Sequence, residues 1–188
     1  MKTIFINFIS GPGVGKTTMA AKLFYEMKIL NLNVEYVQEY AKILVWKKKY
    51  NKLNNQYLVS KKQIKLMKSL KDKVKYVITD GPIIHGLYYN KYNKNNISNK
   101  TKVKELIFKY LRKTDNFNIY LKRNELLKYD KRGREQTKLE AKYIDKKIIN
   151  ILKETKENYI KIKIENKIDE NIKKIINQVL KKGNKNEV

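Results

Sequence analysis

The sequence predicts an α/β protein in which helices cover both faces of a parallel five-stranded sheet, giving three layers. Two observations carry this prediction. Short runs of β-branched and aromatic residues alternate along the chain with segments of helical apolar spacing. Runs such as "IFINFI" and "YVITD" are almost continuously apolar, as in strands that are buried on both faces. The length of 188 residues suits one domain with a core of its own.

Five segments are expected to be strands because they are rich in Ile, Val, Tyr and Phe. They are residues 3–9, 34–38, 76–80, 118–122 and 159–164. Helical patterns lie between them, so we expect neighbouring strands to be parallel.

Helices are expected at four places with clear patterns. They are residues 17–30 after a glycine-rich loop, a stripe with i, i+3, i+4, i+7 spacing at 103–111, a segment from about 138, and a second stripe at 168–179. The polar segment 90–100 is expected to be a mobile surface loop. We expect one domain over residues 1–180 and a disordered tail over 181–188.

The glycine-rich loop "ISGPGVGKTT" at residues 9–18 follows the first predicted strand and precedes the first predicted helix. It matches the phosphate-binding pattern Gly-x-x-x-x-Gly-Lys-Ser/Thr, except that Ser10 stands at the first glycine position. In this motif backbone N–H groups at a helix N-terminus surround a phosphate. The alternative, a glycine turn without a ligand, does not account for the strand–loop–helix order. We predict an ATP site formed by Gly11, Gly13, Val14, Gly15, Lys16, Thr17 and Thr18.

The motif also implies individual roles. Lys16 is expected to reach the β- and γ-phosphates, Thr17 to ligate Mg²⁺, and Thr18 to contact the phosphates from the first helical turn. Such a site needs a carboxylate near the metal, and Asp80 ends an apolar strand where an unpaired charge would be costly. We predict that Asp80 holds Mg²⁺ together with Thr17 and acts in catalysis. A helix N-cap is the alternative role for Asp80.

Glu39 follows the second predicted strand in "VEYVQEYAK". At the carboxyl edge of a parallel sheet it would project into the crevice where ligands of open α/β folds bind. We expect Glu39 to contact the acceptor and to accept a hydroxyl proton as general base. The alternative is a solvated acid in the first turn of a helix.

Arginine is rare in this lysine-rich chain, which contains four arginines. Three of them, Arg123, Arg132 and Arg134, lie within twelve residues. Since lysine is used wherever any cation serves, arginine indicates a need for a planar, bidentate guanidinium. We predict a lid at about 123–137 whose three arginines close over the triphosphate and act in catalysis. An ordinary basic loop is the alternative.

Weaker signals mark an acceptor pocket. Gln56 and Gln63 lie on a helical stretch between the second and third strands, where either amide could hydrogen-bond an acceptor. Trp46 could form a stacking wall, although a lone tryptophan is more often part of the core. His85, the chain's one histidine, is a further pocket candidate.

The formal net charge of +26 raises the question of a polyanionic partner. The lysines are scattered over every segment, and the abundance of Lys, Asn, Ile and Tyr is typical of coding bias in an AT-rich genome. We favour coding bias and keep nucleic acid as a candidate partner. The opening apolar run is too short for a signal peptide or a membrane span, so we expect a cytoplasmic protein that has no membrane partner.

Four motifs together carry a resemblance to a known group. "FISGPGVGKTT", "VQEYAK", "VITDGP" and "LKR" followed by "RGREQT" resemble the small P-loop kinases typified by the nicotinamide-riboside kinase domain of bacterial NAD-biosynthesis regulators, and their compact bacteriophage relatives. The resemblance runs over nearly the whole chain and implies a nucleotide-kinase-like P-loop fold with a short arginine-bearing lid. A bacteriophage origin would imply the host cytoplasm. Asp80 is followed by glycine rather than by the arginine typical of deoxynucleoside kinases, which leaves the acceptor open.

We therefore predict an ATP- and Mg²⁺-dependent phosphotransferase that moves the γ-phosphoryl group to a nucleoside- or nucleotide-like small molecule. One alternative is a nucleic-acid-associated ATPase, or a kinase that acts on modified bases in DNA. A second alternative is a nucleotide-binding switch without transfer chemistry.

Overall fold

Five parallel strands form one sheet in the computed structural model, which describes residues 2–124, 129, 136–164 and 167–185. The strands are β1 (Ile4–Ile9), β2 (Val34–Val37), β3 (Tyr76–Thr79), β4 (Asp115–Lys122) and β5 (Tyr159–Lys163). They lie in the order β2-β3-β1-β4-β5, with every neighbouring pair parallel. This confirms the predicted α/β fold. All five expected strands are present, and β4 alone begins well before its predicted start.

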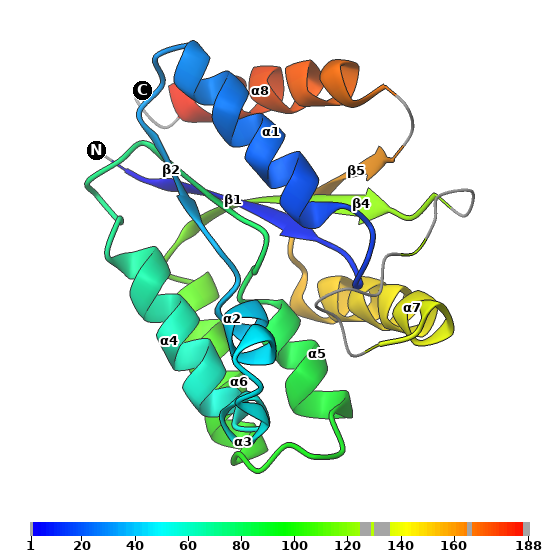
Figure 1. Cartoon of the computed structure of the whole chain (residues 1–188). Helices are drawn as coiled ribbons and strands as arrows, with labels where there is room; N and C mark the ends of the chain where they lie inside the picture. The colour runs from blue at the N-terminus through cyan, green and yellow to red at the C-terminus, as the bar shows by residue number, and fades with distance from the viewer. Residues whose placement is uncertain (1, 125–128, 130–135, 165–166, 186–188) are drawn as a thin grey trace.

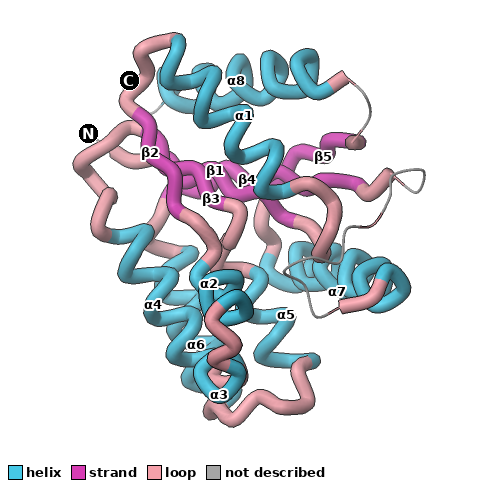
Figure 2. Tube along the Cα trace, in the orientation of Figure 1, coloured by secondary structure: helices cyan, strands magenta, loops and turns pink. Residues whose placement is uncertain are grey.

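Helices cover both faces of the sheet, as expected (Figure 1). α1 (Lys16–Ile29) and α8 (Ile168–Lys185) lie on one face. The other face carries α4 (Gln56–Lys68), α5 (His85–Tyr92), α6 (Lys100–Leu111) and α7 (Lys138–Thr155). Two short helices, α2 (Tyr40–Trp46) and α3 (Tyr50–Leu53), lead from β2 into α4 (Figure 2). The result is the three-layer arrangement that the sequence predicts.

Alternate residues of the central strand β1 explain the two layers of core. Ile4, Ile6 and Phe8 pack with α1 and α8, whereas Phe5 packs with α4 and α6. Ile9 packs with α5 and α7. Every residue of β1 is buried, because helices cover the strand on both sides. The loop that follows β1 therefore starts from a strand that is buried along its whole length.

Two expectations about irregular segments need correction. Residues 93–99 lie outside helices at the surface, as expected, but α5 continues to Tyr92 and α6 begins at Lys100, so the ends of the range 90–100 are helical. Asn90 is buried, and its Nδ2 donates a hydrogen bond to the Lys100 carbonyl at 2.9 Å. The polar side chain of Asn90 is therefore bonded to protein backbone. At the other end, α8 includes residues 181–185, which were expected to belong to a disordered tail.

Candidate active site

The carboxyl ends of β1, β2 and β3 meet at one edge of the sheet. The glycine-rich loop of residues 9–18, called the P-loop below, follows β1, Glu39 follows β2, and Asp80 follows β3. Residues from the P-loop, Glu39 and the turn at Gly81 line one cavity of about 800 Å³. The cavity extends from the start of α1 to the walls formed by α2, α4, α5 and α7. The crevice predicted at this edge of the sheet is therefore present.

The P-loop ends in the left-handed backbone of Gly15, whose φ of 99° is unfavourable for any residue with a β-carbon. Gly15 is the N-cap of α1, so the first-turn N–H groups, which have no acceptor within the helix, stand at the cavity. Lys16 Nζ donates to the carbonyls of Ser10 (3.1 Å) and Gly11 (3.0 Å) across the loop.

Five of the seven residues predicted to bind phosphate line this cavity, namely Gly13, Gly15, Lys16, Thr17 and Thr18. The other two do not. Val14 packs into the core between α1 and the sheet, and the Gly11 N–H donates to Asp145 on α7. Of the predicted set, the residues that line the cavity are thus Gly13 and those from Gly15 to Thr18.

Asp80 connects the P-loop to the segment that follows β2. Its Oδ2 accepts a hydrogen bond of 2.6 Å from the Thr17 hydroxyl, and its Oδ1 accepts one of 3.1 Å from the Glu39 backbone N–H. Asp80 is only 1% exposed. Glu39 in turn lies so close to Gly81 that a β-carbon there would come within 2.6 Å of the Glu39 Cα. The sequence predicted that these acids meet the P-loop, and they lie beside it.

The donor set of Thr17 and Asp80 fits Mg²⁺. Magnesium prefers hard oxygen ligands and commonly takes only one or two from protein, with water and phosphate oxygens completing the octahedron. A hydroxyl and a carboxylate side by side at the mouth of a phosphate cradle meet that requirement. Among the described residues there is no group of three or more His, Asp or Glu side chains that could hold an ion.

Burial shapes the charge states around the cavity. Desolvation raises the pKa of Glu39, Lys16 opposes the shift, and Asp80 adds to it. Desolvation also lowers the pKa of His85 well below 6.5, with a further contribution from Lys16, so His85 is neutral at physiological pH. A carboxylate with a raised pKa is suited to accept a proton from a substrate hydroxyl.

The three arginines predicted for the lid have different outcomes. Arg132 and Arg134 lie outside the described residues. Arg123 does not line the large cavity. Its Nε donates to Asp145 Oδ2 at 2.6 Å and its Nη2 donates to the Pro12 carbonyl at 2.7 Å. With an 8% exposed side chain, Arg123 is bonded to the P-loop backbone and to α7.

Asp145 is a site residue that the sequence analysis missed. Its Oδ1 accepts the Gly11 N–H at 2.7 Å, while its Oδ2 pairs with Arg123. A signal for it exists in the sequence. Asp145 stands beside Ile144 and Ile148 on the apolar face of α7, and a carboxylate on such a face is costly unless it is paired.

The aromatic side chains that line the cavity lie on α2, α5 and α7. Trp46 lines it at the rim and is 63% exposed, so the view of this tryptophan as a core residue is wrong. Tyr88, Tyr89, Tyr92 and Tyr143 also line the cavity. Gln56, Gln63 and His85 line it as expected and are all buried. The Gln63 amide, however, bonds to backbone groups on either side of Glu39.

Known proteins share this arrangement of strand, P-loop and helix. A family model described as "AAA domain" matches residues 5–170. The chain belongs to this AAA domain family. With its P-loop cradle, this AAA domain is a nucleotide-binding domain. No curated protein matches the chain.

Among solved structures, the AAA domain resembles the crystal structure of NadR protein in complex with NAD and AMP-PNP. The TM-score is 0.67 at 12% sequence identity, and the match covers 92% of this chain and 48% of that one. The chain therefore spans about half the length of NadR, and the likeness shows the fold. The resemblance expected from the motifs is confirmed at that level. In the part of the chain that the structure describes, no helix is both long and apolar enough to cross a membrane.

Proposed function

We propose that this protein is an ATP- and Mg²⁺-dependent phosphotransferase whose acceptor is a hydroxyl group of a nucleoside-like molecule. One observation carries the proposal. The Asp80 carboxylate joins the P-loop hydroxyl of Thr17 to the backbone of Glu39, so a phosphate cradle and a carboxylate that can accept a proton share one cavity. The solved complex of NadR with AMP-PNP, an ATP analogue, supports a nucleoside triphosphate as the donor.

The donor side binds and orients the triphosphate. N–H groups at the start of α1 surround its phosphates, and Lys16 neutralises charge on the β- and γ-phosphates. Thr17 and Asp80 would hold Mg²⁺, which, when bound, neutralises charge on the phosphate oxygens. In phosphoryl transfer, positioning and electrostatic stabilisation supply most of the catalysis, so no covalent intermediate is needed.

The acceptor side favours a hydroxyl over a phosphate. The acceptor oxygen bonds to the γ-phosphorus, the bond to the β–γ bridging oxygen breaks, ADP leaves, and the hydroxyl proton passes to Glu39. A carboxylate at this point would repel an acceptor phosphate but suits a neutral hydroxyl. The aromatic wall that includes Trp46, Tyr88 and Tyr92 offers flat apolar surfaces for a ring.

The high net charge favours one second candidate, a nucleic-acid-associated ATPase or a kinase acting on modified bases in DNA. Such a protein would accept a polymeric substrate, or would hydrolyse ATP in response to it. The cavity itself gives a weaker argument for a polymer, because its lining mixes aromatic, amide and aliphatic groups and carries both lysines, such as Lys42 and Lys94, and acids, Glu39 and Glu140.

A transfer assay tests the proposed function. The protein is incubated with Mg²⁺ and ATP labelled in the γ-phosphate, together with nucleosides, nucleoside monophosphates, nicotinamide riboside or hydroxymethylated DNA. We expect the label to appear on a nucleoside-like acceptor. Label found only in free phosphate whatever acceptor is added would contradict the proposal, and label on DNA would support the second candidate.

Two variants connect the assay to the site. Lys16→Ala should lower kcat at least 100-fold, because removing one charge-stabilising group raises the barrier by about 3 kcal/mol.

Glu39→Gln removes the proton acceptor while keeping the side-chain shape, so transfer should fall about 100-fold or more while nucleotide affinity is retained. Transfer that is unaffected by either change would remove that residue from the reaction.

A further inference from the structure

We propose that Gln63 is a positioning residue that fixes Glu39 relative to the P-loop. The role of Glu39 as proton acceptor rests on the proposed function, but the contacts that carry this inference do not. Gln63 lies on α4, is 5% exposed, and lines the cavity. Both polar atoms of its side-chain amide are bonded to protein backbone, so neither is left to bind an acceptor.

Both polar atoms of the Gln63 amide are bonded to the backbone that flanks Glu39. Oε1 accepts a hydrogen bond of 2.8 Å from the Tyr40 N–H, and Nε2 donates one of 3.3 Å to the Gln38 carbonyl. The amide thus spans the residues immediately before and after Glu39. This corrects the expectation that Gln63 hydrogen-bonds an acceptor.

The local backbone needs such support. Glu39 is the N-cap of α2, but its side chain makes no capping hydrogen bond. The first N–H groups of any helix lack partners within the helix, and a helix as short as α2 (Tyr40–Trp46) gains little stability on its own. Gln63 supplies from another helix an acceptor for one of these N–H groups, that of Tyr40, the first residue of α2.

Two further contacts complete the frame around Glu39. Its own N–H donates to Asp80, which also bonds Thr17 of the P-loop, and Gly81 packs against its Cα and Cβ. The Glu39 backbone is therefore held by β3 on one side and by α4 on the other. The Glu39 side chain makes no capping hydrogen bond and lines the cavity.

The test uses Gln63→Met, which has a similar volume but cannot make either bond. We expect kcat for phosphoryl transfer to fall about 10- to 100-fold, since misplacement by about 1 Å can cost 100-fold. The acceptor KM and the nucleotide Kd should stay within about threefold of wild type, because the cradle is untouched. Independently of activity, hydrogen exchange at the Tyr40 amide should become at least about tenfold faster, because its acceptor is lost.

Two other variants make the result specific. Gln63→Glu keeps an acceptor for the Tyr40 N–H and loses the donor to Gln38, so it should restore most of the protection of the Tyr40 amide. Asn116→Met removes a side-chain amide that donates to backbone carbonyls at the opposite end of the sheet. It should lower the Tm and leave kcat and the Tyr40 exchange rate unchanged.

The outcomes separate this proposal from the proposed function. Wild-type kcat and Tyr40 exchange in Gln63→Met would overturn the positioning role while leaving the transferase intact. A loss of kcat in Asn116→Met equal to that in Gln63→Met would assign the effect to general stability. If the wild-type protein transfers phosphate to nothing, the function fails, and the Tyr40 exchange still decides whether Gln63 holds this segment.

Discussion

Asp80 is buried, yet its carboxylate does not lack partners. A buried carboxylate is costly unless hydrogen bonds satisfy its oxygens, and here one donor is the Thr17 hydroxyl and the other is the Glu39 backbone. The bonds that make the charge tolerable are therefore the same bonds that join the P-loop to the loop after β2. Removing this carboxylate would loosen both loops at once.

His85 leads to a prediction about acid stability. Burial and the nearby Lys16 lower its pKa well below 6.5 in the folded protein. Below pH 6.5 the unfolded chain binds a proton that the folded chain does not, so the free energy of unfolding should decrease as the pH falls. One histidine contributes at most about 1.4 kcal/mol per pH unit. Urea denaturation between pH 7.5 and 5.5 measures the slope.

His85→Gln is the control for that measurement. Glutamine does not titrate, so the slope between pH 6.5 and 5.5 should become smaller in the variant. An identical slope in both proteins would assign the acid sensitivity to other groups, most obviously to buried carboxylates.

At the residue scale, the sequence could predict site residues that belong to a motif or follow a strand. It could not predict the role of side chains that hold those residues in place from other helices. Thr17 and Asp80 were found because a motif and an apolar run fix their places. Asp145 and Gln63 act through bonds to backbone groups more than 20 residues away along the chain. Such partners depend on how helices pack, which local patterns do not encode.

At the scale of elements, α7 and the end of β4 brace the P-loop. Arg123 follows β4, Asp145 lies on α7, and together they bond the Pro12 carbonyl and the Gly11 N–H. The ion pair is largely buried, with side chains 8% and 12% exposed. Buried pairs add little net stability compared with apolar residues, but breaking one leaves an uncompensated charge. The Arg123–Asp145 pair therefore fixes the backbone of the P-loop at Gly11 and Pro12.

A double-mutant cycle tests the brace. Arg123→Met and Asp145→Leu alone should each lower the free energy of unfolding by about 3–5 kcal/mol, because each leaves one buried charge unpaired. The double variant should recover much of that loss but should still bind nucleotide more weakly than wild type, since Pro12 and Gly11 lose their partners. Urea denaturation and titration with a fluorescent ATP analogue provide the two readouts. Additive losses would show that the two side chains are not coupled.

Prediction of elements succeeded where the apolar period was long and failed where it was interrupted. The strands and the long helices α1, α6, α7 and α8 follow from apolar runs and stripes. α5 was not predicted, and its last residues were assigned to a polar loop, although Asn90 is buried there and bonds to the Lys100 carbonyl. A polar composition is read as a loop unless its tertiary hydrogen bonds are known.

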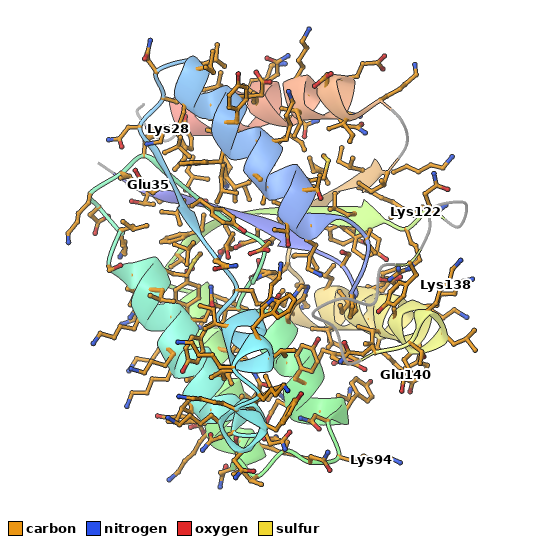
Figure 3. All side chains as sticks on the ribbon, viewed as in Figure 1. Lys28, Glu35, Lys94, Lys122, Lys138 and Glu140 are labelled. Atoms are coloured by element: carbon orange, nitrogen blue, oxygen red, sulfur yellow. The ribbon has the colours of Figure 1, made fainter. Side chains whose placement is uncertain are left out.

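At the scale of the whole molecule, positive charge is distributed rather than concentrated. The chain has 44 Lys and Arg residues against 18 Asp and Glu. In Figure 3, the labelled lysines Lys28, Lys94, Lys122 and Lys138 extend from different parts of the molecule, on both sides of the sheet. Some are paired locally, as Lys28 is with Glu35 at 3.0 Å. A surface of this kind attracts polyanions without selecting a binding mode.

The last prediction concerns that attraction. Binding of a fluorescently labelled DNA duplex should be weak and should decrease steeply with salt, with a slope of log K against log[salt] of about −0.9 for each phosphate neutralised. Heparin should compete fully, because counterion release does not depend on base sequence. ATP turnover, measured at each salt concentration, should be the same with and without DNA, because no contact described in the cavity depends on a polymer. DNA-stimulated turnover that tracks the salt dependence of binding would contradict this expectation, and it would make the charged surface part of the catalytic cycle.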